Sequence, residues 1–264
     1  MDTATILGII IAFATIFGGS MLEEVLHGLG LWNPPAAIIV FGGTIGATMT
    51  SFRMSDLKNI GKYFRAALRI EKLNITELIG EMVRYAEMAR KEGLLTLEET
   101  ISNVRNQFLK KGIQLIVDGT DPALVRDILE IETEYMEERH KIGIEIFKQA
   151  GGYAPTMGII GTVLGLISAL GNLKDTAGIG PRIAIAFVAT FYGVFSANIL
   201  WLPLAKKLQV STKEEISARQ IIIEGILAIQ AGEHPRVIGE KLISFLPPAK
   251  RPSQAKTEGF GVRG

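Results

Sequence analysis

The chain has 264 residues, of which 48% are hydrophobic and 21% are charged, and its net charge is only +1 at pH 7. This near-neutral charge excludes a strongly basic nucleic-acid-binding protein, and we expect no nucleic-acid partner. The absence of cysteine excludes disulfides, thiol catalysis and cysteine metal sites.

Long stretches of the sequence contain no charged side chain, namely residues 3–22, 25–52, 149–173 and 183–205. Each exceeds the roughly 18 apolar residues that indicate a transmembrane helix. One such stretch alone could be a buried helix of a soluble core, but four in one chain favour a membrane protein. The predicted spans are 3–21, 34–52, 154–171 and 183–204. The expected fold class is therefore all-α, a polytopic membrane protein with four transmembrane helices and a helical cytoplasmic domain.

The first predicted span differs from a secretory signal peptide. It is preceded by Asp2 and by no lysine or arginine, whereas a signal peptide begins with a basic region. We therefore expect this helix to be retained.

The distribution of lysine and arginine predicts the orientation of the chain. Segment 53–148 contains 16 of the 28 basic residues and segment 206–264 contains another 10. Both segments are therefore expected on the cytoplasmic side of the cytoplasmic (inner) membrane. Four spans then also place both termini in the cytoplasm.

The same pattern predicts the domain boundaries. Residues 1–52 contain the first two transmembrane helices, and residues 53–150 form a cytoplasmic helical domain. Residues 151–206 contain the third and fourth transmembrane helices. Cytoplasmic helices at 207–248 and a disordered tail at 249–264 follow.

Capping patterns predict helices in the cytoplasmic domain. Asn74 with Glu77 forms a capping box, and Gly93 ends the helix that follows. Thr96 with Glu99 is expected to cap the next helix, whose inner face consists of further apolar residues. These are Leu97, Ile101, Val104 and Phe108.

Asp121 and Pro122 resemble the start of a long helix, with a cap residue followed by proline in the first turn. This helix is expected to continue to Ala150 and join the third span. Between the preceding helices lies "ARKEGLLTLEE", residues 89–99, in which Arg90 and Glu98 belong to charged groups on either side of a glycine turn. Such a tip suits docking to a charged protein, although a solvated helical face is the alternative.

Small residues follow one side of the third and fourth spans. Gly158, Gly161, Gly165, Gly193 and Ala197 are expected to allow close packing of helices in lipid. Thr162 and Thr190 add hydroxyls to these faces, but membrane threonines often bond only the carbonyl four residues before them.

Two prolines accompany the same spans. Pro155 is expected to open the third span, and a simple first-turn proline is the alternative to a mechanical role. Pro203 is expected to free a backbone carbonyl and bend the end of the fourth span, with a helix boundary as the alternative.

No predicted span contains Asp, Glu, Lys, Arg or His. Ion-driven membrane proteins commonly bind or relay the ion at such a residue. Either this chain moves no ion, or a partner supplies the carboxylate. The three histidines are isolated, and "FGGTIG" lacks the Lys-Ser/Thr of a phosphate loop, so we expect neither an enzyme nor a cofactor.

Several motifs together resemble the A subunit of the bacterial flagellar motor stator, the MotA/PomA family. They are "ARKEGLLTLE", "GGYAPTMGIIGTVLGLI", "IGPRIAIAFVATFYGVFSANILWLPLAKKL" and "IIIEGILAIQAGEHPRVIGEKLISFLP". The resemblance extends from residue 1 to about residue 248 and includes the order and spacing of the motifs.

This resemblance implies a homopentameric ring around a dimer of B subunits, MotB- or PomB-like, each of which brings an aspartate into the membrane. Ion flow then rotates the ring, and the cytoplasmic domain pushes the rotor switch protein FliG. Arg90 and Glu98 match the rotor-contacting positions of the family. Pro155 and Pro203 match the family's prolines at the ion pathway and the coupling step.

The resemblance leaves the ion open between sodium and protons. Sodium-driven members carry threonines at the positions of Thr162 and Thr190, so these residues are the candidate Na+ ligands and sodium is favoured. A proton-driven stator is the alternative. An ExbB- or TolQ-like energiser of the outer membrane is a less favoured alternative, and so is a passive membrane scaffold.

Overall fold

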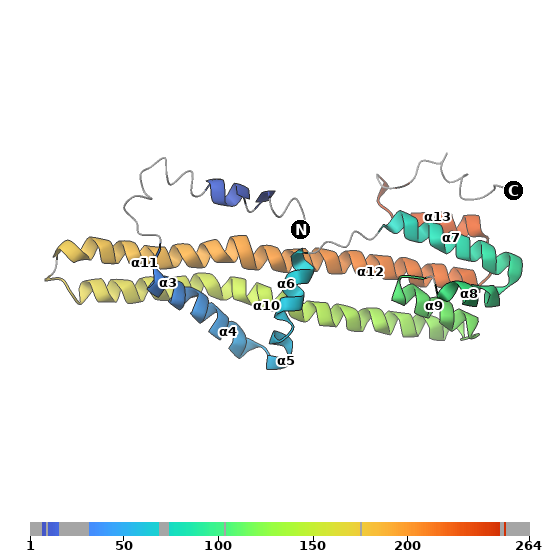
Figure 1. Ribbon diagram of the computed structural model, residues 1–264, viewed down its shortest axis with the longest axis horizontal. Helices are drawn as coiled ribbons and strands as arrows, with labels where there is room; N and C mark the ends of the chain where they lie inside the picture. The colour runs from blue at the N-terminus through green and yellow to red at the C-terminus, as the bar shows by residue number, and fades with distance from the viewer. Residues whose placement is uncertain are drawn as a thin grey trace. The chain divides into compact units, whose positions relative to one another are not determined.

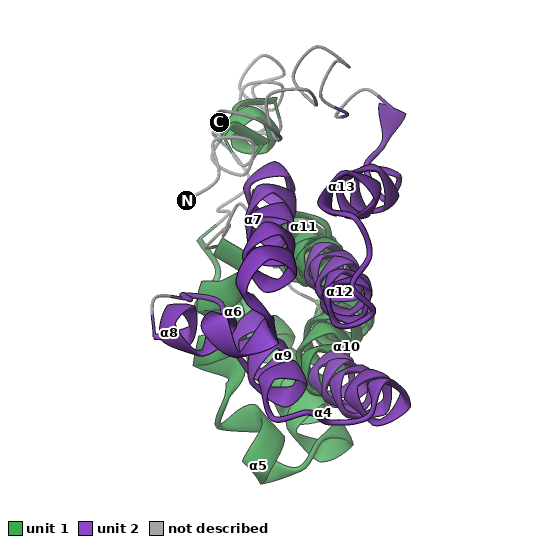
Figure 2. Cartoon of the chain, turned by 90° about the vertical axis from the view of Figure 1, so that its right-hand side faces the viewer, with its two compact units in different colours: residues 1–70, 139–211 green, residues 71–138, 212–264 purple. Residues whose placement is uncertain are grey.

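The computed structural model describes residues 7–8, 10–15, 32–68, 74–102, 104–174, 176–248 and 251. Within these residues every regular element is helical, which confirms the all-α prediction there (Figure 1). The chain divides into two compact units, shown in Figure 2. Unit 1 comprises Met1–Ile70 and Arg139–Ser211, and unit 2 comprises Glu71–Glu138 and Thr212–Gly264.

The unit boundaries differ from the predicted domain boundaries. Segments 53–70 and 139–150 group with the predicted spans, although we expected them in the cytoplasmic domain. The predicted tail at 249–264 lies outside the described residues, apart from Arg251. Most of the first predicted span is also outside them, but its described residues 7–8 and 10–15 are helical.

Unit 1 contains the helices that correspond to the other predicted spans. They are α3 (Pro34–Ala37), η1 (Ile38–Gly42), α4 (Gly43–Ser51), α5 (Met54–Leu57), α6 (Ile60–Leu68), the C-terminal part of α10 (Pro122–Leu170), α11 (Thr176–Ser196), η3 (Ala197–Trp201) and the start of α12 (Leu202–Gln230). The side chain of Asn33 caps α3 by accepting a hydrogen bond from the amide of Ala36 at 2.9 Å.

Two helical stretches in the described part of the chain are long and apolar enough to cross a membrane, Pro122–Leu170 and Ala177–Gln230. They contain the fourth predicted span and all of the third except Gly171. The helical stretch that matches the second predicted span is not one of the two. The count of four spans therefore stays a prediction.

Unit 2 is a helical cluster around its own apolar core. Its elements are α7 (Ile75–Glu92), η2 (Leu94–Thr96), α8 (Leu97–Ile101), α9 (Gln107–Val117), the N-terminal part of α10, most of α12, and α13 (Pro235–Ile243). The largest fully buried side chains of this core include Met82, Leu97, Leu109, Ile113, Leu129, Ile222, Ile226 and Ile238.

The predicted start and end of α7 are confirmed. Asn74 accepts a hydrogen bond from the amide of Glu77 at 3.3 Å, and its amide donates to the carboxylate of Glu77 at the same distance. Gly93 follows the helix with φ of +90°, a conformation that side chains with a Cβ rarely adopt.

The predicted cap at Thr96 is wrong. Thr96 has helical backbone angles, φ −63° and ψ −24°, whereas a capping side chain requires an extended backbone. Its hydroxyl instead donates to the carbonyl of Glu92 at 3.2 Å. The helix that we expected to continue to Phe108 ends at Ile101, and Asn106 caps a new helix, α9.

The long helix α10 is confirmed at its start and through Ala150. The carboxylate of Asp121 accepts a hydrogen bond from the amide of Ala123 at 2.9 Å, and the helix continues unbroken to Leu170. Pro155 lies inside this helix, so its interpretation as a first-turn proline is wrong.

Pro203 also does not end a helix. Helical structure continues from Thr176 to Gln230, and the π-helical turn η3 lies directly before the helix that contains Pro203. A proline has no amide proton, so the carbonyl four residues before it, that of Ile199, lacks its helical donor. The wider π turn is the local adjustment that accompanies this missing hydrogen bond.

Candidate functional site

Small residues form the contact between α10 and α11. A Cβ atom added to Gly193 would lie 2.5 Å from the carbonyl oxygen of Ala154, and one added to Gly158 would lie 2.9 Å from that of Ala189. These neighbours are backbone atoms, which cannot move without moving their helix. The two helices therefore approach more closely than any residue with a side chain would allow.

Gly161 and Gly165 extend this contact along α10. Added Cβ atoms would lie 2.7 Å from the Cβ atoms of Ala189 and Ala186, respectively. Ala197, the last of the predicted packing residues, is 1% exposed and lies in η3. The structure thus places all four predicted glycines in the contact between the two helices.

Four oxygen atoms meet beside this contact, and we call them the oxygen cluster. The hydroxyl oxygen of Thr162 lies 2.5 Å from that of Thr190 on α11. It also lies 2.9 Å from the carbonyl oxygen of Ala186 and 3.1 Å from that of Gly158. The alternative that Thr162 bonds only the carbonyl four residues before it is therefore wrong, because its hydroxyl also reaches the neighbouring helix.

The oxygen cluster contains more lone pairs than protons. Each hydroxyl has one proton to donate, and each carbonyl oxygen has two lone pairs, of which its own helix uses one. Thr162 can donate to only one of its three neighbours at a time. The lone pairs that remain are suited to a hard cation, which prefers hydroxyl and carbonyl oxygens.

The oxygen cluster has no negative charge. The uncharged segments 149–173 and 183–205 contain all four of its oxygen atoms. In the described part of the chain, no group of three or more His, Asp or Glu residues is placed to hold a metal ion. A carboxylate that paired with a cation here would come from outside the cluster.

The structure brings Pro155 to the contact between the helices but does not bring Pro203 there. A Cβ atom on Gly193 would lie 3.1 Å from the Cα atom of Pro155. Pro203 follows Thr190 by thirteen residues, which corresponds to about 20 Å along a helix. Its predicted role must therefore act through the helix and not through contact with the oxygen cluster.

Two pairs of residues in unit 1 were missed by the sequence analysis. The hydroxyls of Ser51 and Tyr153 are 2.8 Å apart and join α4 to α10. The rings of Phe147 and Trp201 stack, with centroids 6.4 Å apart. Tyr153 lies within "GGYAP", directly before the predicted third span. This position at the end of a span was the one feature of the sequence that could have drawn attention to Tyr153.

The charged tip of unit 2, residues 89–99, carries exposed charges, which fit both docking and a solvated helical face. Arg90 and Lys91 lie at the end of α7, and Glu98 and Glu99 lie in the first turn of α8. All four side chains are exposed, and none forms an ion pair with another of the described residues. Their charges are therefore available to a partner.

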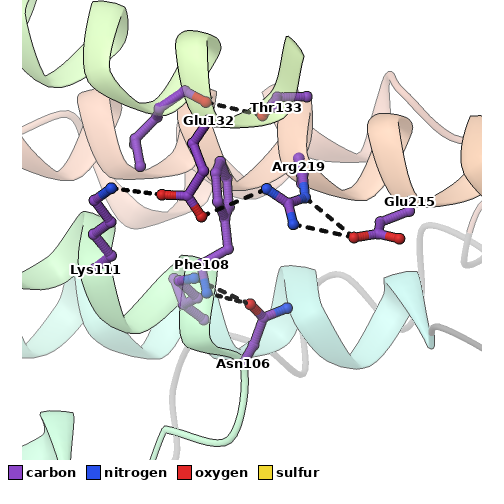
Figure 3. A network of polar contacts seen from close by, with 9 residues as sticks. Asn106, Phe108, Lys111, Glu132, Thr133, Glu215 and Arg219 are labelled. Carbon is purple, nitrogen blue, oxygen red and sulfur yellow. Dashed lines mark hydrogen bonds and ion pairs between the residues drawn. The ribbon is translucent and has the colours of Figure 1, made fainter. Parts of the chain in front are cut away.

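An ionic network supports the core of unit 2 (Figure 3). The guanidinium of Arg219 lies 3.1 Å from the carboxylate of Glu215 and 3.7 Å from that of Glu132. It also lies over the ring of Phe108, 4.5 Å from the ring centroid. Lys111 completes the network with an ion pair to Glu132 at 2.5 Å. The network ties α9, α10 and α12 together.

A second ionic group in unit 2 surrounds Glu224. Its carboxylate lies 2.9 Å from Arg126 and 3.2 Å from Lys241. Burial acts to raise the pKa of Glu224, but hydrogen bonds from Arg126 and Lys241 outweigh burial and lower the pKa. The same contact, led by the hydrogen bond to Glu224, raises the pKa of Arg126.

The two apolar helices are long enough to cross a membrane, and they pack against each other through glycine residues. Their contact contains threonine hydroxyls but no charged side chain. These features are typical of helical membrane proteins. Comparison with known families gives a more specific result. A profile of the MotA/TolQ/ExbB proton channel family matches residues 100–221, and a profile of the motility protein A N-terminal region matches residues 6–93. The chain belongs to the MotA/TolQ/ExbB proton channel family, in its MotA/PomA branch.

Individual relatives agree with this assignment. Motility protein A of Bacillus subtilis is 42% identical over 95% of this chain and 93% of its own length. Chemotaxis protein PomA of Vibrio alginolyticus is 38% identical over 95% of this chain and 98% of its own length. This family is a channel family and not an enzyme class.

Two solved structures are similar to the chain. The C. jejuni MotAB structure matches with a TM-score of 0.90 and 33% identity, covering 96% of this chain and 100% of the matched chain. The flagellar MotAB stator complex of Bacillus subtilis matches with a TM-score of 0.89 and 41% identity, covering 95% and 98%. Both similarities extend over nearly the whole chain.

Proposed function

We propose that the chain is an ion-conducting A subunit of a bacterial flagellar stator in the inner membrane. The proposal includes four transmembrane spans with both termini in the cytoplasm. It also includes a ring of five copies of this chain around two B subunits. Family membership and the MotAB complexes among the similar structures support it. The match of residues 6–93 to a motility protein A profile favours a stator over an ExbB- or TolQ-like energiser.

The single observation that supports ion conduction best is the oxygen cluster. It offers two hydroxyls and two carbonyls beside the glycine contact between two apolar helices, and it has no charge of its own. A MotB- or PomB-like partner helix with an aspartate would supply the missing carboxylate. The described spans contribute no ionisable group to this cluster, so in this proposal the partner is the source of the charge that ion-driven membrane proteins commonly use.

The same cluster favours sodium as the ion. Thr162 and Thr190 supply oxygen ligands that can replace the water around Na+, whereas a proton needs only a group that titrates. Proton conduction remains the alternative, and the description of the family as a proton channel family keeps it open.

In this proposal, the tip of unit 2 transmits force to the rotor switch protein FliG. Arg90 and Glu98 present exposed charges of opposite sign, and neither is paired with another described residue. Charges at the rim of a contact set the rate and register of association.

The test is swimming speed as a function of external sodium at fixed pH and constant ionic strength, in cells that swim with this stator alone. We expect a speed that saturates with sodium, and Thr162→Ala should raise the half-saturating sodium concentration about tenfold or more, because one ligand oxygen is lost.

Thr156→Ala is the matched control. Thr156 is exposed on the same helix, and its hydroxyl donates to the backbone carbonyl of Tyr153 at 2.7 Å. This variant should keep the parent's sodium dependence. If the parent's speed is indifferent to sodium, the sodium assignment is wrong and the proton-driven alternative stands.

A further inference from the structure

Leu95 is a large apolar side chain on the outside of the tip of unit 2. It is the middle residue of η2 and is 70% exposed, whereas Leu97 is 0% exposed and Leu94 packs against the core. In a 3₁₀ turn, residues three apart lie on the same side. Leu94 and Leu97 therefore face inward together, and Leu95 faces outward. Leu94 and Leu97 pack against the core of unit 2, whereas Leu95 does not.

The turn that carries Leu95 is held by several hydrogen bonds. The amide of Gly93 donates to the carbonyl of Ala89 at 2.9 Å, and the amide of Thr96 donates to the carbonyl of Gly93 at 3.3 Å. The hydroxyl of Thr96 donates to the carbonyl of Glu92 at 3.2 Å. A turn that is already fixed loses little backbone entropy when a partner binds to it.

Exposed charged residues flank Leu95 on both sides in the sequence. They are Arg90, Lys91 and Glu92 before the turn and Glu98 and Glu99 after it, all exposed. Within the part of the chain that the structure describes, none of the five forms an ion pair. A central apolar anchor with a rim of unused charges is the usual arrangement of a protein-binding surface.

We propose that Leu95 is the apolar anchor by which the tip docks on its rotor partner. This inference rests on the proposed stator function. The partner surface would offer an apolar pocket for Leu95, with acidic side chains facing Arg90 and Lys91 and basic side chains facing Glu98 and Glu99. The anchor supplies affinity, and the surrounding charges supply the rate of association and the register.

The experiment measures binding of purified FliG from the same cells to the full stator complex, with the dissociation rate and the salt dependence as readouts. Leu95→Ala should weaken binding about tenfold or more, mostly through faster dissociation, with an unchanged salt dependence. Arg90→Glu should instead slow association and alter the salt dependence. Leu95→Met keeps an apolar side chain of similar size and should bind nearly as well as the parent.

Val237→Ala is the matched control, because Val237 is also an exposed aliphatic residue of unit 2, 53% exposed on α13. It should change binding less than twofold. Equal binding by Leu95→Ala and the parent, while Arg90→Glu is impaired, overturns the anchor but leaves the stator function intact. Absence of any FliG binding by the parent overturns the proposed rotor contact itself.

Discussion

Replacing Gly193 by alanine tests whether the glycine contact holds the two apolar helices of unit 1 in place. Gly193 lies on α11 against the backbone of α10. This backbone is so close that a methyl group on Gly193 has no room. We expect Gly193→Ala to destabilise the protein and to impair ion-driven rotation in the same variant.

The magnitude follows from the geometry. An added Cβ would lie 2.5 Å from the carbonyl oxygen of Ala154, whereas ordinary van der Waals contact begins at 3.4 Å. The two helices must therefore separate by the difference, about 0.9 Å. Overpacking of this kind costs about 1–3 kcal/mol. For a chain of this size, each kcal/mol lowers Tm by about 2–4 °C. The hydroxyl of Thr190 lies about one helical turn from Gly193, so its contact with the hydroxyl of Thr162 would lengthen as well.

The assay is thermal unfolding of the purified complex, together with swimming speed at saturating sodium. Gly152→Ala is the matched control, because Gly152 is exposed on α10 and an added Cβ there meets no atom within 4 Å. It should keep or slightly raise Tm, since alanine favours a helix over glycine. Equal Tm values for Gly193→Ala, Gly152→Ala and the parent would refute the close-packing argument.

Two further predictions concern unit 2. Because the folded state lowers the pKa of Glu224 below its ordinary value of 4.5, this carboxylate stabilises the fold above that pH, and its contribution is lost as the pH falls through the lowered pKa. Glu224→Gln should therefore lower Tm at pH 7, and the difference in Tm from the parent should shrink below about pH 4.5. A difference in Tm that stays constant with pH would contradict the stabilisation of the Glu224 carboxylate by Arg126 and Lys241. Asn106→Ala removes the side-chain cap of α9 and should cost about 1 kcal/mol in thermal unfolding. Thr96→Ala should cost less, because Thr96 does not cap its helix, and equal losses would show that the cap of Asn106 is not what stabilises α9.

The helices of this chain could be predicted where the signal is local. Uncharged stretches identify apolar helices, and the caps at Asn74 and Asp121 involve only neighbouring residues. Thr96 misled the prediction because a capping sequence does not show the backbone angles of its residue. Gly93 with positive φ, followed by a 3₁₀ turn, placed Thr96 in a helical conformation in which its hydroxyl cannot reach forward.

The oxygen cluster could be predicted only in part. Thr162 and Thr190 were noticed because each lies among small residues at helical spacing, and the resemblance to sodium-driven stators made them candidate ligands. The carbonyl of Ala186 was not foreseen, because it depends on how far the two helices are shifted along one another. Pairs that are distant in sequence were missed for a similar reason. Ser51 and Tyr153 are 102 residues apart, and Arg126 and Glu224 are 98 residues apart.

The absence of charge around the oxygen cluster has a physical consequence for assembly. A cation bound by Thr162, Thr190 and two carbonyls alone would retain its full charge in an apolar setting, where an uncompensated charge is costly. These oxygens can replace water molecules around the cation, but they do not neutralise its charge. A partner's carboxylate both removes that cost and adds a strong ligand. In the proposed stator, the chain thus supplies selectivity through its oxygens while the partner supplies the charge, so that ion passage begins only when both are assembled.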